Sequence, residues 1–286
     1  MPALPAKRGR GHPKVYPDRL FLKALVIMIV RHLHTVHELL CVLAQPTSEM
    51  TLLRQLLMEQ ECFPSRRTWE RRLQALPATL PAQIGCLGRY LVSLIQPWAA
   101  CGRAVAIDST VLRSRGGVWH QKHREKGEIP HTSIDPEAHW TKSGWHGWVY
   151  GWKLHVVSVV AAVWFPIAAV LTPANVADSD PAPDLHELCE RDDRLLVATQ
   201  YGRYPHTDDG VEVRRIFHKL RSRAMENFNE HFKGIFDGHG QVPTKGLLAT
   251  QRFALGAIFV YQLALLYRFE HGLDLCVGLK AFLKAA

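Results

Sequence analysis

The chain has 286 residues, a formal net charge of +9 and 47% hydrophobic residues. That apolar fraction can build a buried core, and the moderate charged fraction of 21% excludes wholesale disorder. The excess of Lys and Arg favours a polyanionic partner, because basic side chains release the counterions condensed on phosphates. The six cysteines include no Cys-x-x-Cys pair, which favours reduced thiols in a cytoplasm over a disulfide framework.

The N-terminal third has the pattern of an all-α region. Residues 1–16 are rich in Pro, Gly and basic side chains, which predicts a flexible arm. Apolar residues then recur at spacings of three and four up to about residue 100, which predicts a helical DNA-binding domain over residues 1–100. Pro46 and the two residues after it predict a helix start at Glu49, and Ser65 is placed to cap another helix.

The helix expected after Ser65 carries four arginines in its first seven residues. We expect Arg66, Arg67 and Arg71 to contact double-stranded DNA, as the second helix of a helix-turn-helix motif does. The alternative is a solvated helix face that packs through Trp69 and Leu73.

From residue 102 onwards, short apolar runs typical of strands replace the helical pattern. Three antiparallel strands are predicted over residues 103–109, 152–162 and 164–171, with a basic loop over 111–128 between the first two. Further elements are a helix over 182–191, a strand over 195–199, a helix from about Arg214 and an apolar helix over 250–269. Together they predict a second domain over residues 101–286, with a mixed sheet flanked by helices.

Aromatic residues gather between the first two predicted strands, namely Trp140, Trp145, Trp148 and Tyr150. Alternate positions from Trp148 onwards favour one packed face of a strand. The alternative is a surface on which these rings stack on unpaired bases, helped by Lys142, His146 and Lys153.

Two acidic residues stand out in this basic chain. Asp108 ends an apolar run, and Glu226 lies in a basic amphipathic segment 118 positions later. An ionised carboxylate near a core is costly unless it is paired or bound to a metal. Two such acids therefore suggest divalent-metal chemistry on a phosphodiester backbone.

Four segments around these acids resemble the insertion-sequence transposases of the DDE class, in that family's order. They are residues 105–110, 151–155, 171–179 and 223–226, the last followed by Lys233. The resemblance implies a ribonuclease H-like catalytic fold, cleavage and strand transfer at transposon ends, and Mg²⁺ or Mn²⁺ as the cofactor. It also implies that Asp108 and Glu226 are the first and last members of a metal-binding carboxylate triad.

Several neighbours of these acids are expected to serve the same site. Arg223 and Lys233 lie three residues before and seven after Glu226, near its helical face, where they are placed to contact phosphate. Lys153 is a further expected DNA contact. Glu230 is a rival to Glu226 because it lies four residues on, on the same helical face.

The middle Asp of the implied triad is missing at the expected place. Thr199 and Gln200 end the strand predicted over 195–199, whereas Asp192 and Asp193 precede it. Asp178, Asp180 and Asp184 are interpreted as residues that cap the helix after them. The sequence therefore suggests a transposase with an internal deletion, which cuts DNA poorly or not at all. The alternatives are a non-catalytic DNA-binding remnant that modulates an intact transposase, and a stand-alone nuclease.

Membrane insertion is not expected for this chain. The apolar stretch 255–267 is shorter than the roughly 20 residues that cross a bilayer, and no signal peptide precedes the first apolar run. We expect a cytoplasmic protein without a membrane partner, which assembles with copies of itself on DNA.

Overall fold

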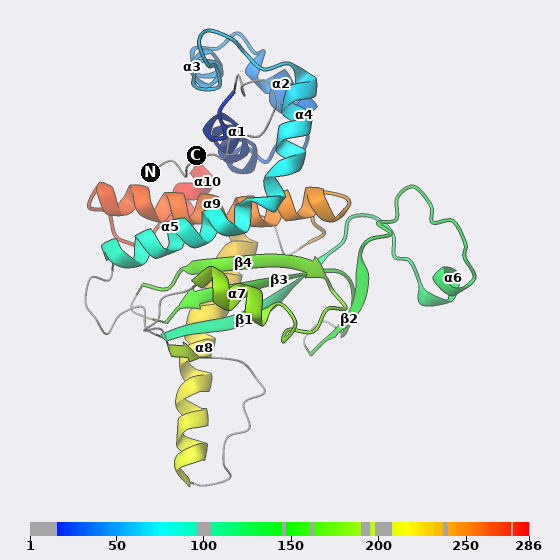
Figure 1. Ribbon diagram of the computed structural model, residues 1–286, viewed down its shortest axis with the longest axis vertical. Helices are drawn as coiled ribbons and strands as arrows, with labels where there is room; N and C mark the ends of the chain where they lie inside the picture. The colour runs from blue at the N-terminus through cyan, green and yellow to red at the C-terminus, as the bar shows by residue number, and fades with distance from the viewer. Residues whose placement is uncertain are drawn as a thin grey trace, which may run out of the picture.

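The computed structural model describes residues 16–95, 104–144, 147–160, 163–189, 195–197, 208–236, 240–275 and 277–285. Figure 1 shows three levels: a group of N-terminal helices, a layer of long helices, and a twisted β-sheet. The arm predicted at the N-terminus lies outside the described residues except for Tyr16.

The N-terminal region is helical throughout its described residues 16–95. Its elements are α1 (Asp18–Val30), α2 (Val36–Leu43), α3 (Ser48–Leu56), α4 (Arg66–Ala75), the 3₁₀ turn η1 (Leu76–Ala78) and α5 (Leu80–Ile95). The predicted helix starts are confirmed, with α3 beginning one residue earlier than expected. Thr47 and Ser65 are the N-caps of α3 and α4, and their hydroxyls accept hydrogen bonds from the backbone of Met50 and Thr68.

Helix α9 (Leu247–Glu270) connects the helical levels. It packs against α1, α4 and α5, and its buried residues belong to the same core cluster as those of the N-terminal helices and the sheet. A boundary between two domains at residue 100 therefore stays a prediction. By length and composition α9 also passes for a membrane span, but 72% of its apolar window is buried, as in the core helix of a soluble protein. The helix is longer than the apolar stretch 255–267 that we expected from the sequence. Its apolar character is explained by its burial in the core.

The sheet is built on β3 (Gly147–Val159), the longest strand. Its strands follow the order β2-β3-β1-β5. Strands β2 (His139–Ser143) and β4 (Pro166–Pro173) pair with successive parts of the same edge of β3. The pairs β1·β3, β2·β3 and β3·β4 are antiparallel, whereas the short β5 (Leu195–Val197) runs parallel to β1 (Ala104–Arg113). The expected antiparallel meander is thus confirmed.

The main differences between the sheet and the sequence prediction are two strand boundaries and one additional strand. Strand β1 continues to Arg113, β3 starts five residues earlier than expected, and β2 was not predicted. The predicted basic loop therefore shrinks, and it contains the short helix α6 (Gln121–Glu125). Pairing between β1 and β3 explains the extension, because the register continues through Val111, Leu112 and Arg113.

Helices cover both faces of the sheet. Figure 1 shows α7 (Ala182–Cys189) in front of the sheet and α8 (Asp208–Ile235) crossing behind it. Helix α8 packs on β1 and β3, and Met225, Phe228 and Phe232 on its inner side are fully buried. The short helix α10 (Leu279–Ala285) contacts α8 and α9. Helices α5 and α9 lie along β4, where a Cβ on Gly88 would come within 2.7 Å of the Ile167 backbone.

Candidate functional site

Asp108 lies in the middle of β1, just beyond the stretch in which β1 pairs with the parallel strand β5. Strand β5 pairs with β1 only at residues 104–106, so Asp108 stands two residues beyond the last pair. Its side chain is half-buried, and its Oδ1 accepts a hydrogen bond from the backbone N–H of Ser109 at 2.9 Å. In open sheets, functional groups gather beyond the carboxyl ends of parallel strands. Asp108 lies beyond the paired residues of β5, while its own strand β1 continues to Arg113.

Glu226 lies on the helix that packs against this strand. Met225 and Phe228, which flank it closely, are fully buried, while Glu226 itself is exposed. Within the described part of the chain it has no hydrogen bond or ion pair. Glu230, the rival acid, faces Lys233 closely enough to raise the pKa of that ammonium, although burial lowers this pKa more strongly. Because Glu230 already interacts with Lys233, Glu226 is the better candidate for a metal ligand.

Strand alternation assigns Asp108 to the face of the sheet that α8 covers. The next residue, Ser109, donates a hydrogen bond to Asp178 in the segment between β4 and α7, so Ser109 faces the α7 side. Successive side chains of a strand point to opposite faces. Asp108 therefore points to the other side of the sheet, behind which α8 runs (Figure 1). The fold thus brings the two elements that carry Asp108 and Glu226 together.

A polar cluster occupies the α7 face beside Ser109. We call Ser109, Lys153, His155 and Asp178 the Asp178 cluster. The Asp178 carboxylate accepts from the Ser109 hydroxyl at 2.8 Å and lies 3.2 Å from the Lys153 ammonium. Lys153 also donates to the backbone oxygen of Val176 at 3.0 Å. Our interpretation of Asp178 as a helix cap is therefore wrong, because its carboxylate binds side chains of β1 and β3.

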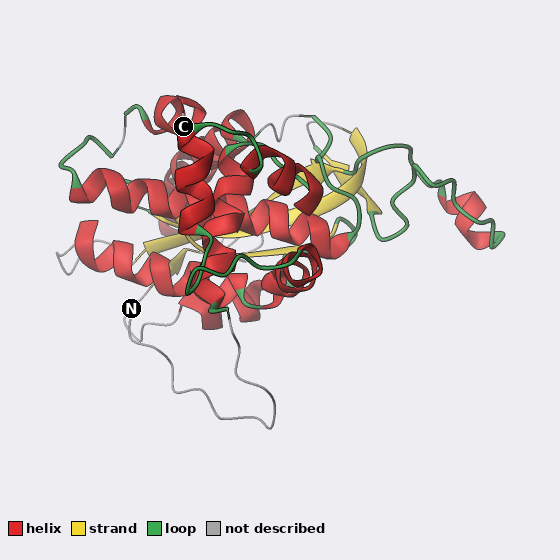
Figure 2. Cartoon of the chain, turned by 90° about the horizontal axis from the view of Figure 1, so that it is seen from above, coloured by secondary structure: helices red, strands yellow, loops and turns green. Residues whose placement is uncertain are grey.

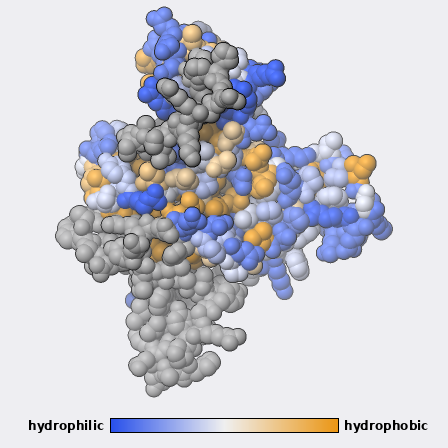
Figure 3. Space-filling view, in the orientation of Figure 1, coloured by the Kyte–Doolittle hydropathy of each residue, from blue (hydrophilic) through white to orange (hydrophobic). Residues whose placement is uncertain are grey.

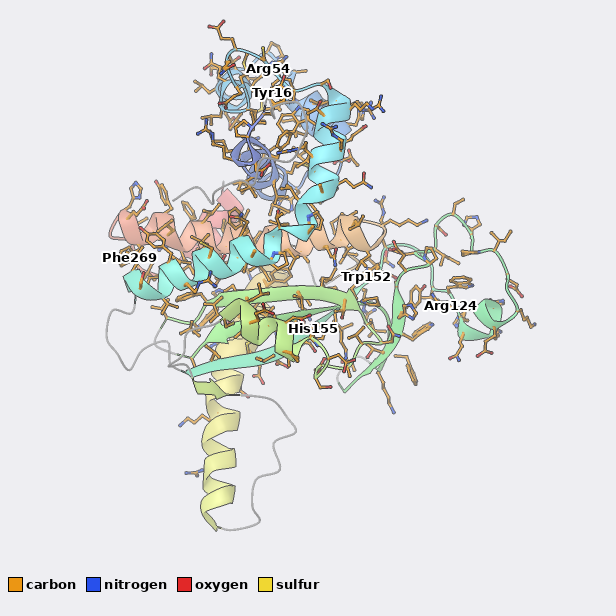
Figure 4. All side chains as sticks on the ribbon, in the orientation of Figure 1. Tyr16, Arg54, Arg124, Trp152, His155 and Phe269 are labelled. Atoms are coloured by element: carbon orange, nitrogen blue, oxygen red, sulfur yellow. The ribbon has the colours of Figure 1, made fainter. Side chains whose placement is uncertain are left out.

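His155 completes the cluster as a neutral side chain. It is 1% exposed, and its Nε2 lies 2.9 Å from the Thr172 hydroxyl (Figure 4 labels His155 beside α7). Burial lowers the pKa of His155 to about 4, although the Asp178 carboxylate, 3.7 Å from its Nδ1, acts in the opposite direction. The desolvation penalty dominates, so this approach is a contact of a neutral imidazole and not an ion pair at pH 7.

The cluster joins three of the segments that carried the family resemblance. Ser109 comes from residues 105–110, Lys153 and His155 from 151–155, and Asp178 from 171–179. The similarity of these segments was visible in the sequence, but their contacts were not, since no local pattern links residues so far apart. The Lys153 ammonium, expected on DNA, is bound within the chain at 15% exposure.

The other basic residues predicted to contact DNA have different surroundings. Arg67 and Arg71 are exposed and have no hydrogen bond or ion pair in the described residues, whereas Arg66 pairs with Glu70 at 2.8 Å. Burial lowers the pKa of the half-buried Lys233, and Arg113 lowers it further. The side chain of Arg223 lies outside what the structure describes. Of the five predicted contacts whose side chains the structure describes, Arg67 and Arg71 are the most available.

A cavity of about 1040 Å³ separates the N-terminal helices from the sheet region. Its walls are α2, α4, the start of α9 with the segment before it, and both ends of the insertion between β1 and β2. The lining includes charges of both signs, namely Arg66, Arg115, Lys245, Arg252, Glu38, Glu70 and Glu137. Arg66 thus faces this cavity, while Arg67 and Arg71 lie elsewhere on α4.

The carboxylates expected to hold a metal form an incomplete set. Among the described residues there is no group of three or more His, Cys, Asp or Glu side chains arranged to bind a metal ion. Asp108 and Glu226 supply oxygen ligands of the kind that Mg²⁺ prefers. Residues 199 and 200, at the place expected for the middle Asp, and the two acids 192 and 193 lie outside the described residues.

The structure has a mixed sheet with helices on both faces, and Asp108 lies in the middle of its inner strand β1. The family model described as transposase DDE domain matches residues 99–261, which is more than half of the chain. The chain therefore belongs to the transposase DDE domain family. A search of the curated proteins found no match, and neither did a search of the solved structures.

Proposed function

We propose that this chain is an insertion-sequence transposase that acts on the ends of a DNA element, with Asp108 and Glu226 as its metal-binding carboxylates. The observation that carries the proposal is the packing of α8 on β1, with Asp108 directed to the α8 side. Three antiparallel strands, a helix and a parallel fourth strand beside the first further support a ribonuclease H-like arrangement. The family match supports a transposase-type function.

The two acids have distinct expected tasks. Asp108 comes from a rigid strand, so its backbone position is set by the sheet, and Glu226 comes from α8, which packs on that strand. A bound Mg²⁺ or Mn²⁺ supplies activation of water or of a 3′-hydroxyl at a DNA phosphate. We expect two carboxylates to support slower catalysis than a triad. Loss of one electrostatic group of this kind costs about 3 kcal/mol in transition-state stabilisation, or a hundredfold or more in rate.

Arg67 and Arg71 are the residues best placed to bind the duplex. They lie four positions apart on α4, so they share one face of the helix, while Trp69 and Leu73 anchor its other side in the core. Guanidinium groups on an outward helix face contact phosphates and base edges of a major groove. We propose that α4 presents these two arginines to the transposon end.

A cleavage assay tests the catalytic part of the proposal. Linear DNA that carries the element's ends is incubated with the chain and Mg²⁺ or Mn²⁺, and strand nicks are resolved on a denaturing gel. We expect slow nicking that Asp108→Asn and Glu226→Gln each reduce at least a hundredfold. Glu230→Gln is the matched control on the same helix, and it should retain the rate. Equal loss in all three variants would contradict the assignment of Glu226.

A second candidate function is a non-catalytic DNA-binding remnant that modulates an intact transposase. The absence of a three-ligand group among the described residues favours it. In this case the chain binds the ends but cuts none with either metal. Arg67→Ala and Arg71→Ala should each weaken DNA binding. Each should also reduce the slope of log affinity against log salt concentration by about one, because one fewer counterion is released. The exposed Lys23 on α1 provides a control, since Lys23→Ala should change neither quantity.

A further inference from the structure

The hairpin of β2 and β3 has one aromatic face. Trp140 pairs with Tyr150 across the two strands, and Lys142 pairs with Trp148 two positions nearer the tip. Directly paired residues share a face, and so do residues two apart in a strand. These four side chains therefore line the same side of the hairpin.

The inner part of this face is covered by the insertion between β1 and β2. The Trp140 and Tyr150 rings lie 5.4 Å apart, and His120 stacks on Trp140 at 5.7 Å. The Trp140 indole donates to the backbone oxygen of Trp119, and the Tyr150 hydroxyl donates to that of Asp135. The structure thus confirms a packing role for Trp140 and Tyr150.

Trp148 lies on the same face without such a cover. Its side chain is 68% exposed, and among the described residues no ring or cation contacts it. A Cβ added to Gly144 or Gly147, at the turn of the hairpin, would meet nothing within 4 Å. A Trp side chain can bury 150–250 Å² of surface, so an indole left in water forgoes a large gain in free energy. This exposure points to a partner.

The surroundings of Trp148 favour a polyanion as that partner. Lys142, directly across the strand pair, is exposed, and Lys122 and Lys126 on the neighbouring insertion are exposed as well. In the described residues none of the three ammonium groups has a carboxylate partner.

Figure 2 shows the insertion extending away from the body of the molecule, and Figure 3 shows that its surface is largely hydrophilic. The exposed acids of the same insertion, Glu125 and Glu128, are bonded to Gln121 and His123. The three lysines therefore leave an excess of positive charge, which disfavours a second copy of the same hairpin and attracts phosphate.

We propose that Trp148 and Lys142 form a stacking site for an unpaired DNA base, with the indole under the base and the ammonium on the adjacent phosphate. Single strands fit this chemistry because their bases offer free π-faces, whereas bases inside a duplex are already stacked on each other. The proposal rests on the proposed function only in that DNA is the substrate. It does not require the chain to cut DNA.

Fluorescence anisotropy with a labelled oligothymidylate and a labelled duplex of equal length tests the site. We expect Trp148→Ala to weaken binding of the single strand about tenfold and to leave duplex binding within twofold. Trp148→Phe, which keeps an aromatic ring, should restore most of the affinity. Ile129→Ala is the matched control, because Ile129 is a 95% exposed apolar residue on the neighbouring insertion.

Three outcomes would overturn the stacking site. The first is a wild-type chain that does not bind oligothymidylate. The second is an equal loss of single-strand and duplex affinity in Trp148→Ala. The third is a change from dimer to monomer in sedimentation of that variant, which would show that a second copy covers the indole. Absence of strand cleavage, in contrast, would refute only the catalytic assignment of Asp108 and Glu226. A melting temperature equal to that of the wild type shows that the variant is folded.

Discussion

The two faces of β1 show how neighbouring residues of one strand can serve different purposes. On the α7 face, Ser109 belongs to a cluster in which the Asp178 carboxylate is balanced by Lys153 within the chain. On the α8 face, Asp108 lies under a helix whose acid Glu226 has no ion pair in the described residues. The polar side chains on the first face bind each other, and they therefore stabilise the fold. The second carries the two carboxylates that we propose as metal ligands.

The largest expected effect is a pH dependence on the α7 face. The pKa of His155 is lowered to about 4 from 6.5, so the unfolded chain binds the proton more tightly than the folded one. The stabilising contribution of neutral His155 is therefore complete above pH 6.5 and is lost as the pH falls toward 4, by about 3 kcal/mol. Urea unfolding at a series of pH values measures this loss.

His155→Gln should flatten the pH profile, because Gln does not titrate and can still bond the Thr172 hydroxyl. The exposed His37 gives the matched control, and His37→Gln should keep the parent profile. If the His155→Gln variant loses as much stability between pH 7 and pH 4 as the parent does, the assignment of the pH dependence to this imidazole is wrong.

Removal of the carboxylate from the Asp178 cluster should have the next largest effect. In Asp178→Ala the Lys153 ammonium, 15% exposed, keeps only the Val176 oxygen, and the Ser109 hydroxyl loses its acceptor. Breaking a fully buried pair costs 3–5 kcal/mol, but Asp178 is 39% exposed, so we expect about 2 kcal/mol in the free energy of unfolding. Asp180→Ala, an exposed acid two positions on, should change it by less than about 0.5 kcal/mol. Equal effects of the two substitutions would show that the cluster does not stabilise the fold.

Local signals in the sequence predicted the helices and the central strands well. Ser65 caps α4 as its position before an arginine-rich amphipathic run indicated, and the apolar runs around 103–109 and 195–199 became β1 and β5. The early start of β3 was missed because it depends on pairing. Gly151, a weak strand former, sits where a Cβ would lie 2.0 Å from the Leu112 oxygen of the adjacent strand.

The candidate site was predictable only in part, for a similar physical reason. Asp108 ends an apolar run and Glu226 follows a helical pattern, so both stand out locally. Asp178 also had a plausible local explanation as a helix cap, but its partners Lys153 and Ser109 lie 25 and 69 positions away. Long-range contacts of this kind arise from strand pairing, and a single sequence holds no periodicity that reveals them.

Asp108→Asn, on the opposite face of β1, should have the smallest effect on intrinsic stability. An Asn Oδ1 still accepts the Ser109 N–H, so the free energy of unfolding without metal should change by less than about 0.5 kcal/mol. The response to Mn²⁺ separates the two faces more sharply. At ten times its Kd, a metal that binds only the folded chain adds about 1.4 kcal/mol, and we expect Asp108→Asn to abolish this gain while Asp178→Asn retains it. A gain that survives in Asp108→Asn would place the metal elsewhere, and a parent chain without any gain would favour the non-catalytic remnant.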